Sequence, residues 1–315
     1  MGIAKLEKFI KYAKKKLPYV LFGMQTNMLL IDLDWIKFFK KYKIAPGISI
    51  DGNFKKENAL RLKSFDLREK LNLLKKHKIR FGTLMVLSSN NISNFYRNLE
   101  IFVKKYRVSS VKANFVENMS LPEFCYPEVS AGQMYQKVFL PVMDIFFSKY
   151  KIYEANIAHL IDIYINKLLF KETSAKTAAY SICHAKFCGG GNAIVEVEPD
   201  GKILFCGRWN KTNKVNVMNN LEDFSDHFGL SSYLRVLDLQ LKKTKAVRQT
   251  GCDKCPAAGI CNYGCLAFSY VKYHGDIKIR SELICDYYKK VINYFNERYH
   301  QIIYIYSMIT KKEMR

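Results

Sequence analysis

The chain has 315 residues, 49% hydrophobic and 25% charged, which is typical of a soluble globular protein with one large domain or two ordinary ones. The formal net charge of +23 is compatible with an anionic partner, but the lysines lie in short clusters on amphipathic patterns, which favours solvated helix faces. No apolar run reaches the ~18 residues of a membrane span, and lysines interrupt any signal-peptide core, so we expect a cytoplasmic protein without disulfides.

The first 116 residues alternate between helical and strand patterns. Helices are expected at 3–16, 33–43, 64–78 and 92–106, and strands at 19–25, 47–51, 80–87 and 109–116. Repeated βα units with apolar strands predict a parallel sheet of barrel or doubly wound type. The opening helix follows no strand, which leaves an uncovered sheet edge, so we expect βα units missing ahead of residue 1.

The pattern changes after Pro122. Residues 129–170 are expected to be helical, 192–209 to contain a hairpin with its turn at 199–201, and 286–308 to form one amphipathic helix. Glu154 and Asp162 are available as a catalytic base in the helical region, but both fit the exposed face of an amphipathic helix. We therefore assign no catalytic residue from the sequence.

Eight of the nine cysteines lie in one region, at Cys183, Cys188, Cys206, Cys252, Cys255, Cys261, Cys265 and Cys285. Four thiolates suit either a structural zinc ion or a [4Fe–4S] cluster, and eight make two sets of four. Only the 252/255 pair has the C-x2-C form usual in zinc sites, which disfavours zinc. Cys125 stands apart and is expected to be a half-buried thiol.

The cysteine order C-x4-C-x17-C, then C-x2-C-x5-C-x3-C, then Cys285, resembles the SPASM domain of radical S-adenosylmethionine (radical SAM) enzymes that modify peptides and proteins. These include anaerobic sulfatase-maturating enzymes. The resemblance implies two auxiliary [4Fe–4S] clusters with interleaved ligands. The first would take Cys183, Cys188, Cys206 and Cys265, and the second Cys252, Cys255, Cys261 and Cys285.

The N-terminal half resembles the same family. The segments MQTNM and GISIDGN are similar to its QTNG-type and SIDGP strand ends, with Met28 where glycine is usual and Asn53 where proline is usual. The resemblance implies that Gln25, Thr26, Asn27, Ser49 and Asp51 contact the S-adenosylmethionine. The residues alone equally allow polar groups that close the ends of strands.

The resemblance implies an α/β fold in four parts. These are a partial (β/α) barrel of parallel strands at 1–120, a helical connector at 121–180, a SPASM iron–sulfur domain at 181–290 and a C-terminal helix at 291–315. The family's C-x3-C-x2-C loop, which binds the cluster that cleaves S-adenosylmethionine, is absent from the sequence, as is its G-G-E segment. We expect either a fragment or a protein that has lost the radical step.

Three functions remain open at this stage. The first is part of a radical SAM oxidoreductase that modifies a peptide or protein side chain and takes electrons from a donor such as ferredoxin or flavodoxin. S-adenosylmethionine and a third [4Fe–4S] cluster would then belong only to the full-length enzyme. The second is an iron–sulfur module for electron transfer or peptide binding. The third is a basic zinc protein that binds nucleic acid, which the cysteine spacing disfavours.

Overall fold

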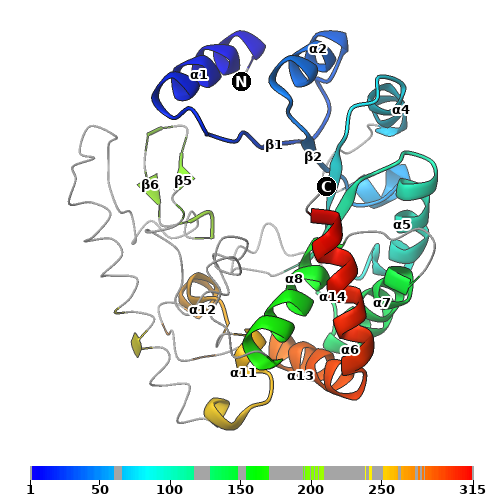
Figure 1. The fold of residues 1–315 in the computed structure, drawn as a ribbon, viewed down its shortest axis with the longest axis vertical. Coiled ribbons are helices and arrows are strands. Elements are labelled where there is room, and N and C mark those ends of the chain that lie inside the picture. The colour runs from blue at the N-terminus through cyan, green and yellow to red at the C-terminus, as the bar shows by residue number, and fades with distance from the viewer. Residues whose placement is uncertain are drawn as a thin grey trace. The chain divides into compact units, whose positions relative to one another are not determined.

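The computed structural model describes most of the chain outside its cysteine-rich middle (Figure 1). The described ranges are 2–59, 66–116, 128–147, 154–169, 251–261, 264–273 and 281–313, together with single residues and short stretches between 194 and 242 and between 276 and 279. The chain divides into two compact units: residues 1–116, 127–129 and 136–156 form the first, and the remainder forms the second. None of the described helices is both long and apolar enough to cross a membrane.

The first unit contains a four-stranded sheet in the order β1-β2-β3-β4, with every neighbouring pair parallel. The strands are β1 (Met24–Thr26), β2 (Pro46–Ser49), β3 (Gly82–Leu87) and β4 (Ser110–Phe115). They alternate with α1 (Ile3–Lys16), α2 (Leu33–Tyr42), α4 (Arg68–Lys76) and α5 (Phe95–Lys104). The predicted parallel α/β fold is confirmed, but the first strand is shorter than expected, since 20–23 form no ladder.

Local sequence explains how α2 begins and ends. Asp32 caps α2, as its side-chain oxygen accepts hydrogen bonds from the backbone N–H groups of Asp34 and Trp35 at 3.0 and 3.1 Å. The helix ends at Lys43, whose φ of 54° lies in the left-handed region that closes many helices. The side chains of Phe38 and Phe39 are buried in the core.

A long helical region follows the sheet, but it is not one uninterrupted helix. Its described parts are α6 (Ala131–Met134), a π-helical turn (Tyr135–Phe139), α7 (Leu140–Phe147), α8 (Ala155–Ile163) and a second π-helical turn (Tyr164–Leu169). Glu154, just before α8, was expected on an exposed face, and this was wrong. Its side chain is only 1% exposed, because its Oε1 accepts a hydrogen bond from the Ala113 N–H of β4 at 2.8 Å.

The second unit contains the predicted hairpin and the C-terminal helices. Strands β5 (Glu196–Val197) and β6 (Ile203–Leu204) pair antiparallel, and Gly201 in their turn has a φ of +88°. Downstream lie α11 (Ala258–Cys261), α12 (Leu266–Lys272), α13 (Glu282–Glu297) and α14 (Tyr299–Glu313). The expectation of one terminal helix was wrong, because Arg298 leaves the helical conformation (φ −125°, ψ 33°) and divides it into two.

Candidate functional site

The five residues expected to contact S-adenosylmethionine lie at or just beyond the carboxyl ends of β1 and β2. Gln25 Nε2 donates a hydrogen bond to Ser49 Oγ at 2.9 Å, which joins the side chains of the two strands on one face of the sheet. On that face, Ser49 is level with Leu84 of β3, which in turn is level with Lys112 of β4. Lys112 is exposed. This row therefore presents an amide, a hydroxyl and an ammonium group.

The side chains of Thr26 and Asn27 accept hydrogen bonds from backbone N–H groups two residues further along the chain. Thr26 Oγ1 accepts from the Met28 N–H at 3.0 Å, and Asn27 Oδ1 accepts from the Leu29 N–H at 3.2 Å. Met28 is fully buried and has a φ of 71°, in the left-handed region that favours glycine. The turn therefore requires a glycine-like backbone at this position, and Met28 adopts it at a cost of about 1–2 kcal/mol.

Asp51 is part of a buried polar network that holds the loop after β2. Its Oδ1 accepts a hydrogen bond from the Val86 N–H of β3 at 2.8 Å, and its backbone N–H donates to Asn58 Oδ1 at 2.8 Å. The amide of Asn91 donates to the Asp51 carbonyl at 3.1 Å and to the Val86 carbonyl at 2.8 Å. Asp51 therefore fastens the end of β2 to β3.

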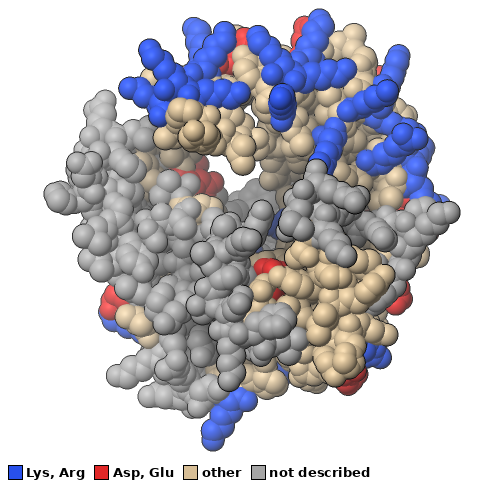
Figure 2. Space-filling model, in the orientation of Figure 1, with Lys and Arg blue, Asp and Glu red and all other residues tan. Residues whose placement is uncertain are grey.

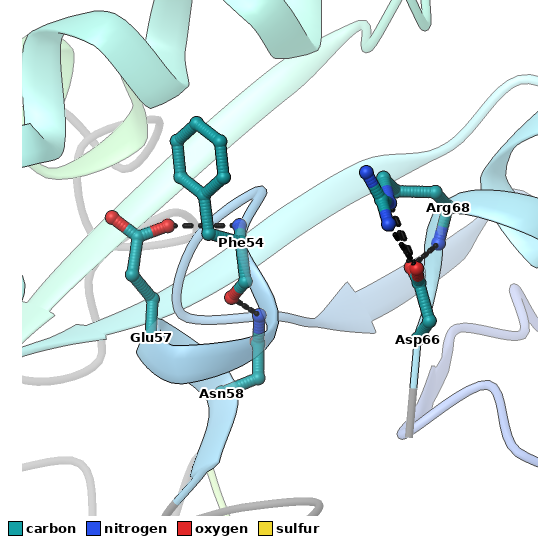
Figure 3. Close-up of polar contacts among 5 residues, drawn as sticks. All are labelled: Phe54, Glu57, Asn58, Asp66 and Arg68. Atoms are coloured by element: carbon teal, nitrogen blue, oxygen red, sulfur yellow. Dashed lines mark hydrogen bonds and ion pairs between the residues drawn. The ribbon is translucent and has the colours of Figure 1, made fainter. Parts of the chain in front are cut away.

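The same network includes residues that the sequence pattern did not indicate. Glu57 accepts from the Phe54 N–H at 2.9 Å, and Asn58 donates to the Phe54 carbonyl at 3.0 Å (Figure 3). Asn98, on α5 and wholly buried, donates to Glu57 at 3.0 Å. A Cβ on Gly52 would lie 2.2 Å from Glu57 Oε2, so only glycine fits there.

Figure 3 also shows the ion pair of Arg68 with Asp66. The Arg68 side chain donates hydrogen bonds to the Asp66 carboxylate, which lowers the pKa of Asp66.

Four of the eight clustered cysteines line one cavity of about 270 Å³ in the second unit. They are Cys252, Cys255, Cys261 and Cys285. Tyr288 and Lys289, one turn further along α13, complete the wall beside the backbone of 256–258. Gly251, with a φ of +85°, begins the turn that carries Cys252 and Cys255 around the cavity. Three of these cysteines thus come from the short segment 252–261, which ends in α11, and the fourth comes from α13.

The other described cysteines do not line this cavity. Cys265 caps α12, and its Sγ accepts a hydrogen bond from the Phe268 N–H at 3.4 Å. Cys206 follows β6, and a Cβ on the adjacent Gly207 would lie 2.7 Å from Glu196 Oε2. Glu196 therefore lies beside the cysteine-bearing segment, and burial raises the pKa of its carboxyl. The sequence pattern did not indicate this residue. Cys183, Cys188 and Cys125 lie outside the described residues.

Among the described residues, no three His, Cys, Asp or Glu side chains converge closely enough to hold a single metal ion. Four cysteines nevertheless surround the cavity, and all six described cysteines are thiols rather than disulfides. The four cysteines of the cavity therefore border one shared space.

No family model matches the sequence. The cysteine-type anaerobic sulfatase-maturating enzyme of Clostridium perfringens (strain 13 / Type A) is 22% identical over 285 residues, which are 86% of this chain and 71% of that protein. The enzyme of the same description from Clostridium novyi (strain NT) is 29% identical over 114 residues, which are 33% of this chain and 30% of that protein.

Solved structures agree with these sequence relationships. Native anSMEcpe with bound AdoMet and Cp18Cys peptide has a TM-score of 0.70 at 21% identity. The match covers 98% of this chain and 82% of the anSMEcpe chain. Streptococcus suis SuiB has a TM-score of 0.60 at 16% identity and covers 86% and 62%. By fold and by sequence, the chain is similar to the anaerobic sulfatase-maturating enzymes, as its resemblance to radical SAM enzymes with a SPASM domain led us to expect.

Proposed function

We propose that the chain is an iron–sulfur protein of the radical SAM/SPASM type whose second unit binds two [4Fe–4S] clusters. Cys252, Cys255, Cys261 and Cys285 ligate one cluster. The other takes Cys183, Cys188, Cys206 and Cys265. The observation that carries the proposal is the cavity of about 270 Å³ that the first four cysteines line together, while Cys265 lies outside it.

The spacing of these cysteines favours a cluster over a zinc ion. Zinc sites usually carry two short C-x2-C pairs, and among the four cysteines of the cavity only Cys252 and Cys255 form one. The four cysteines line a space of about 270 Å³. A cluster fills such a space and takes one thiolate at each of its four irons.

When bound, such a cluster supplies one-electron transfer. The protein's own part is to position the thiolates and set their electrostatics. The tight turn after Gly251 presents two of them, and α13 presents Cys285 at the helix's first turn, where Ser281 caps it through the Ile284 N–H at 3.4 Å. Lys289 places a cation in the cavity wall one turn beyond Cys285. A cation there favours the more negative, reduced state of a bound centre.

In a full-length enzyme that carries the cluster loop, the first unit is proposed to contact S-adenosylmethionine through Gln25 and Ser49. Among the five candidates, these two have side chains joined to each other on the sheet face, whereas Thr26, Asn27 and Asp51 bond the protein's own backbone. Thr26, Asn27 and Asp51 hold the strand ends that carry these two side chains, and all five residues are proposed to form the pocket. The presence of AdoMet in structures of anSMEcpe supports the choice of ligand.

A peptide or protein is the proposed substrate partner, because anSMEcpe and SuiB have been solved with the Cp18Cys peptide and the precursor peptide SuiA. The 315-residue sequence contains no C-x3-C-x2-C loop. The proposal concerns the auxiliary clusters and the substrate side of maturase chemistry, which the residues of this sequence supply. Ferredoxin or flavodoxin is the proposed class of electron partner.

The test is anaerobic purification followed by iron, acid-labile sulfide and zinc analysis with electron paramagnetic resonance (EPR). The proposal predicts about eight irons and eight sulfides per chain and a reduced-state EPR signal from [4Fe–4S] centres. Stoichiometric zinc without sulfide or visible absorption would contradict it and favour the basic zinc protein.

A further inference from the structure

Helices α2, α4 and α5 of the first unit end in one repeated sequence. It reads two lysines, a ring-bearing residue, a third cation and then Ile or Val, and it occupies 40–44, 75–79 and 104–108. In every copy the three cations are exposed and the fifth residue is buried. The three helix ends therefore present nine exposed cations between them. This basic rim consists of Lys40, Lys41, Lys43, Lys75, Lys76, Lys78, Lys104, Lys105 and Arg107.

The sheet brings the three copies to one edge. Each helix returns the chain to the start of the next parallel strand, so all three helix ends lie beside the amino ends of β2, β3 and β4. These strands are in register there, because Gly47 is level with Gly82, which is level with Ser110. The third cation of each copy precedes this level by three or four residues. The basic rim is therefore one continuous surface and not three separate clusters.

The third cation of each copy adopts a backbone conformation that favours glycine. Lys43, Lys78 and Arg107 have φ values of 54°, 57° and 56°. Their N–H groups each donate to a carbonyl of the last helical turn at 3.0 to 3.3 Å, which closes the helix. Glycine makes the same closure without the steric penalty of a Cβ, and it is the usual residue at this position. A cation stands there three times at a cost in stability, which indicates that its charge is used.

The charge of the rim exceeds what the helices need. A helix end carries about half a negative elementary charge, which less than one full cation offsets. None of the three copies contains Asp or Glu. Among the described residues, ion pairs reach two of the nine cations: Lys41 pairs with Glu7 at 2.9 Å, and Lys104 with Glu100 at 2.7 Å. Figure 2 shows lysine and arginine side chains gathered over the side of the molecule that carries α2, α4 and α5.

The side chains of the rim discriminate among anionic partners. Ile44, Ile79 and Val108 are buried, so the copies offer no apolar side chain to insert into a membrane. The ring-bearing residue of each copy is buried or half-buried, so none offers an exposed ring for an unpaired base to stack on. Eight of the nine cations are lysines, which bind phosphate as point charges. The copies recur with the strands, about 4.8 Å apart, and a duplex also carries its phosphates at regular intervals.

We propose that the basic rim binds the phosphate backbone of a nucleic-acid duplex without reading its bases. Such binding releases counterions, so the affinity falls steeply as the salt concentration rises. The site lies in the first unit and includes neither the cysteines nor the residues proposed to contact S-adenosylmethionine. It therefore stands whether or not the clusters and the cofactor are bound.

The probe is a fluorescein-labelled DNA duplex of about twenty base pairs, and its binding to the anaerobically purified full chain is followed by anisotropy. A second DNA sequence and an RNA duplex are measured beside it. The proposal predicts that both DNA sequences bind equally. It also predicts a slope of about −4 for the logarithm of the affinity against the logarithm of the salt concentration, as expected if about half of the nine cations contact phosphates. The RNA duplex shows which kind of duplex the rim prefers, and equal binding of DNA and RNA supports recognition of phosphate alone.

One variant separates the charge of the rim from its fold. Lys43→Gly combined with Lys78→Gly and Arg107→Gly should weaken binding of the DNA duplex at least tenfold and reduce the salt slope by about 2 to 3. The same variant should raise the urea midpoint of unfolding, because glycine adopts the positive φ at lower cost. Weaker binding that came from a damaged fold would lower that midpoint instead.

A matched pair of double variants tests the position of the charge. Lys75→Gln combined with Lys76→Gln removes two cations of the rim and should weaken binding about fivefold. Lys55→Gln combined with Lys56→Gln removes two exposed lysines that follow the carboxyl end of β2, and it should leave binding unchanged.

Several results overturn the proposal. They are no binding of either duplex, a salt slope near zero, or an equal loss of binding from the Lys55 and Lys56 variant. Binding to phosphatidylglycerol vesicles without binding to a duplex assigns the rim to a membrane surface instead. Tighter binding of a poly-glutamate peptide than of either duplex assigns it to an acidic protein.

Discussion

Asp51→Ala tests whether this carboxylate supports the fold or contacts a ligand. The side chain is buried and accepts the Val86 N–H at 2.8 Å, which replaces a backbone carbonyl where β2 ends. Removing a charged acceptor and leaving a buried N–H unpaired costs about 2–4 kcal/mol. Asp51→Asn keeps an acceptor oxygen and should cost about 1 kcal/mol. The free energy of unfolding, measured by urea denaturation at constant slope, checks both values.

Ser49→Ala is the matched control in the neighbouring strand position. Ser49 is also buried, but its hydroxyl accepts its hydrogen bond from the exposed Gln25 amide, so its loss should cost less than about 1 kcal/mol. In the full-length enzyme the same variant should weaken S-adenosylmethionine binding. The structural role of Asp51 is refuted if Asp51→Ala costs no more than Ser49→Ala.

Two further predictions concern charge. Hydrogen bonds from Lys41 and then Tyr42 lower the pKa of Glu7 below its ordinary 4.5, so the stability that this contact contributes is present above that value and is lost as the pH falls through the lowered pKa. Unfolding midpoints of wild type and Lys41→Gln should therefore differ at pH 7 and converge in acid, and a constant gap would contradict this. Lys289→Gln should lower the reduction potential of the cluster in the cavity by about 20–40 mV, because a cation that favours the reduced state is removed. Lys290→Gln, on the next residue of α13 and outside the cavity lining, is its control in redox titrations followed by EPR, and equal shifts for both variants would remove the special role of Lys289.

The sequence predicted the parallel sheet because its strands and helices carry strong, distinct periods. The apolar run of β3 and the amphipathic spacing of α5 are typical of a strand and a helix in a βα unit. The Asp32 cap could also be predicted, since a short acceptor side chain before an apolar helix has few other uses. The shared cavity of Cys252, Cys255, Cys261 and Cys285 was anticipated only through family resemblance, because spacing alone does not bring Cys285 to cysteines that lie 24 to 33 residues earlier.

Other features left no readable signal. Asn58, Asn91 and Asn98 are polar residues that local patterns place on the surface, yet tertiary contacts bury them as partners for backbone groups. Glu154 is buried for the same reason, since it satisfies a sheet N–H that no local rule connects to it. The break between α13 and α14 at Arg298 contains neither Gly nor Pro, the residues that usually indicate the end of a helix. The hydrogen bonds of Asn98 and Glu154 each join residues 41 positions apart, which local patterns do not connect.

The division of the cysteines between two clusters is the central claim, and single substitutions test it most directly. Cys255→Ser and Cys265→Ser each remove a ligand from a different proposed cluster. Iron analysis and reduced-state EPR of the anaerobically purified variants should show about four irons lost in each, with a different EPR component missing from each. Loss of the same component in both variants, or bound zinc in place of iron, would contradict the account.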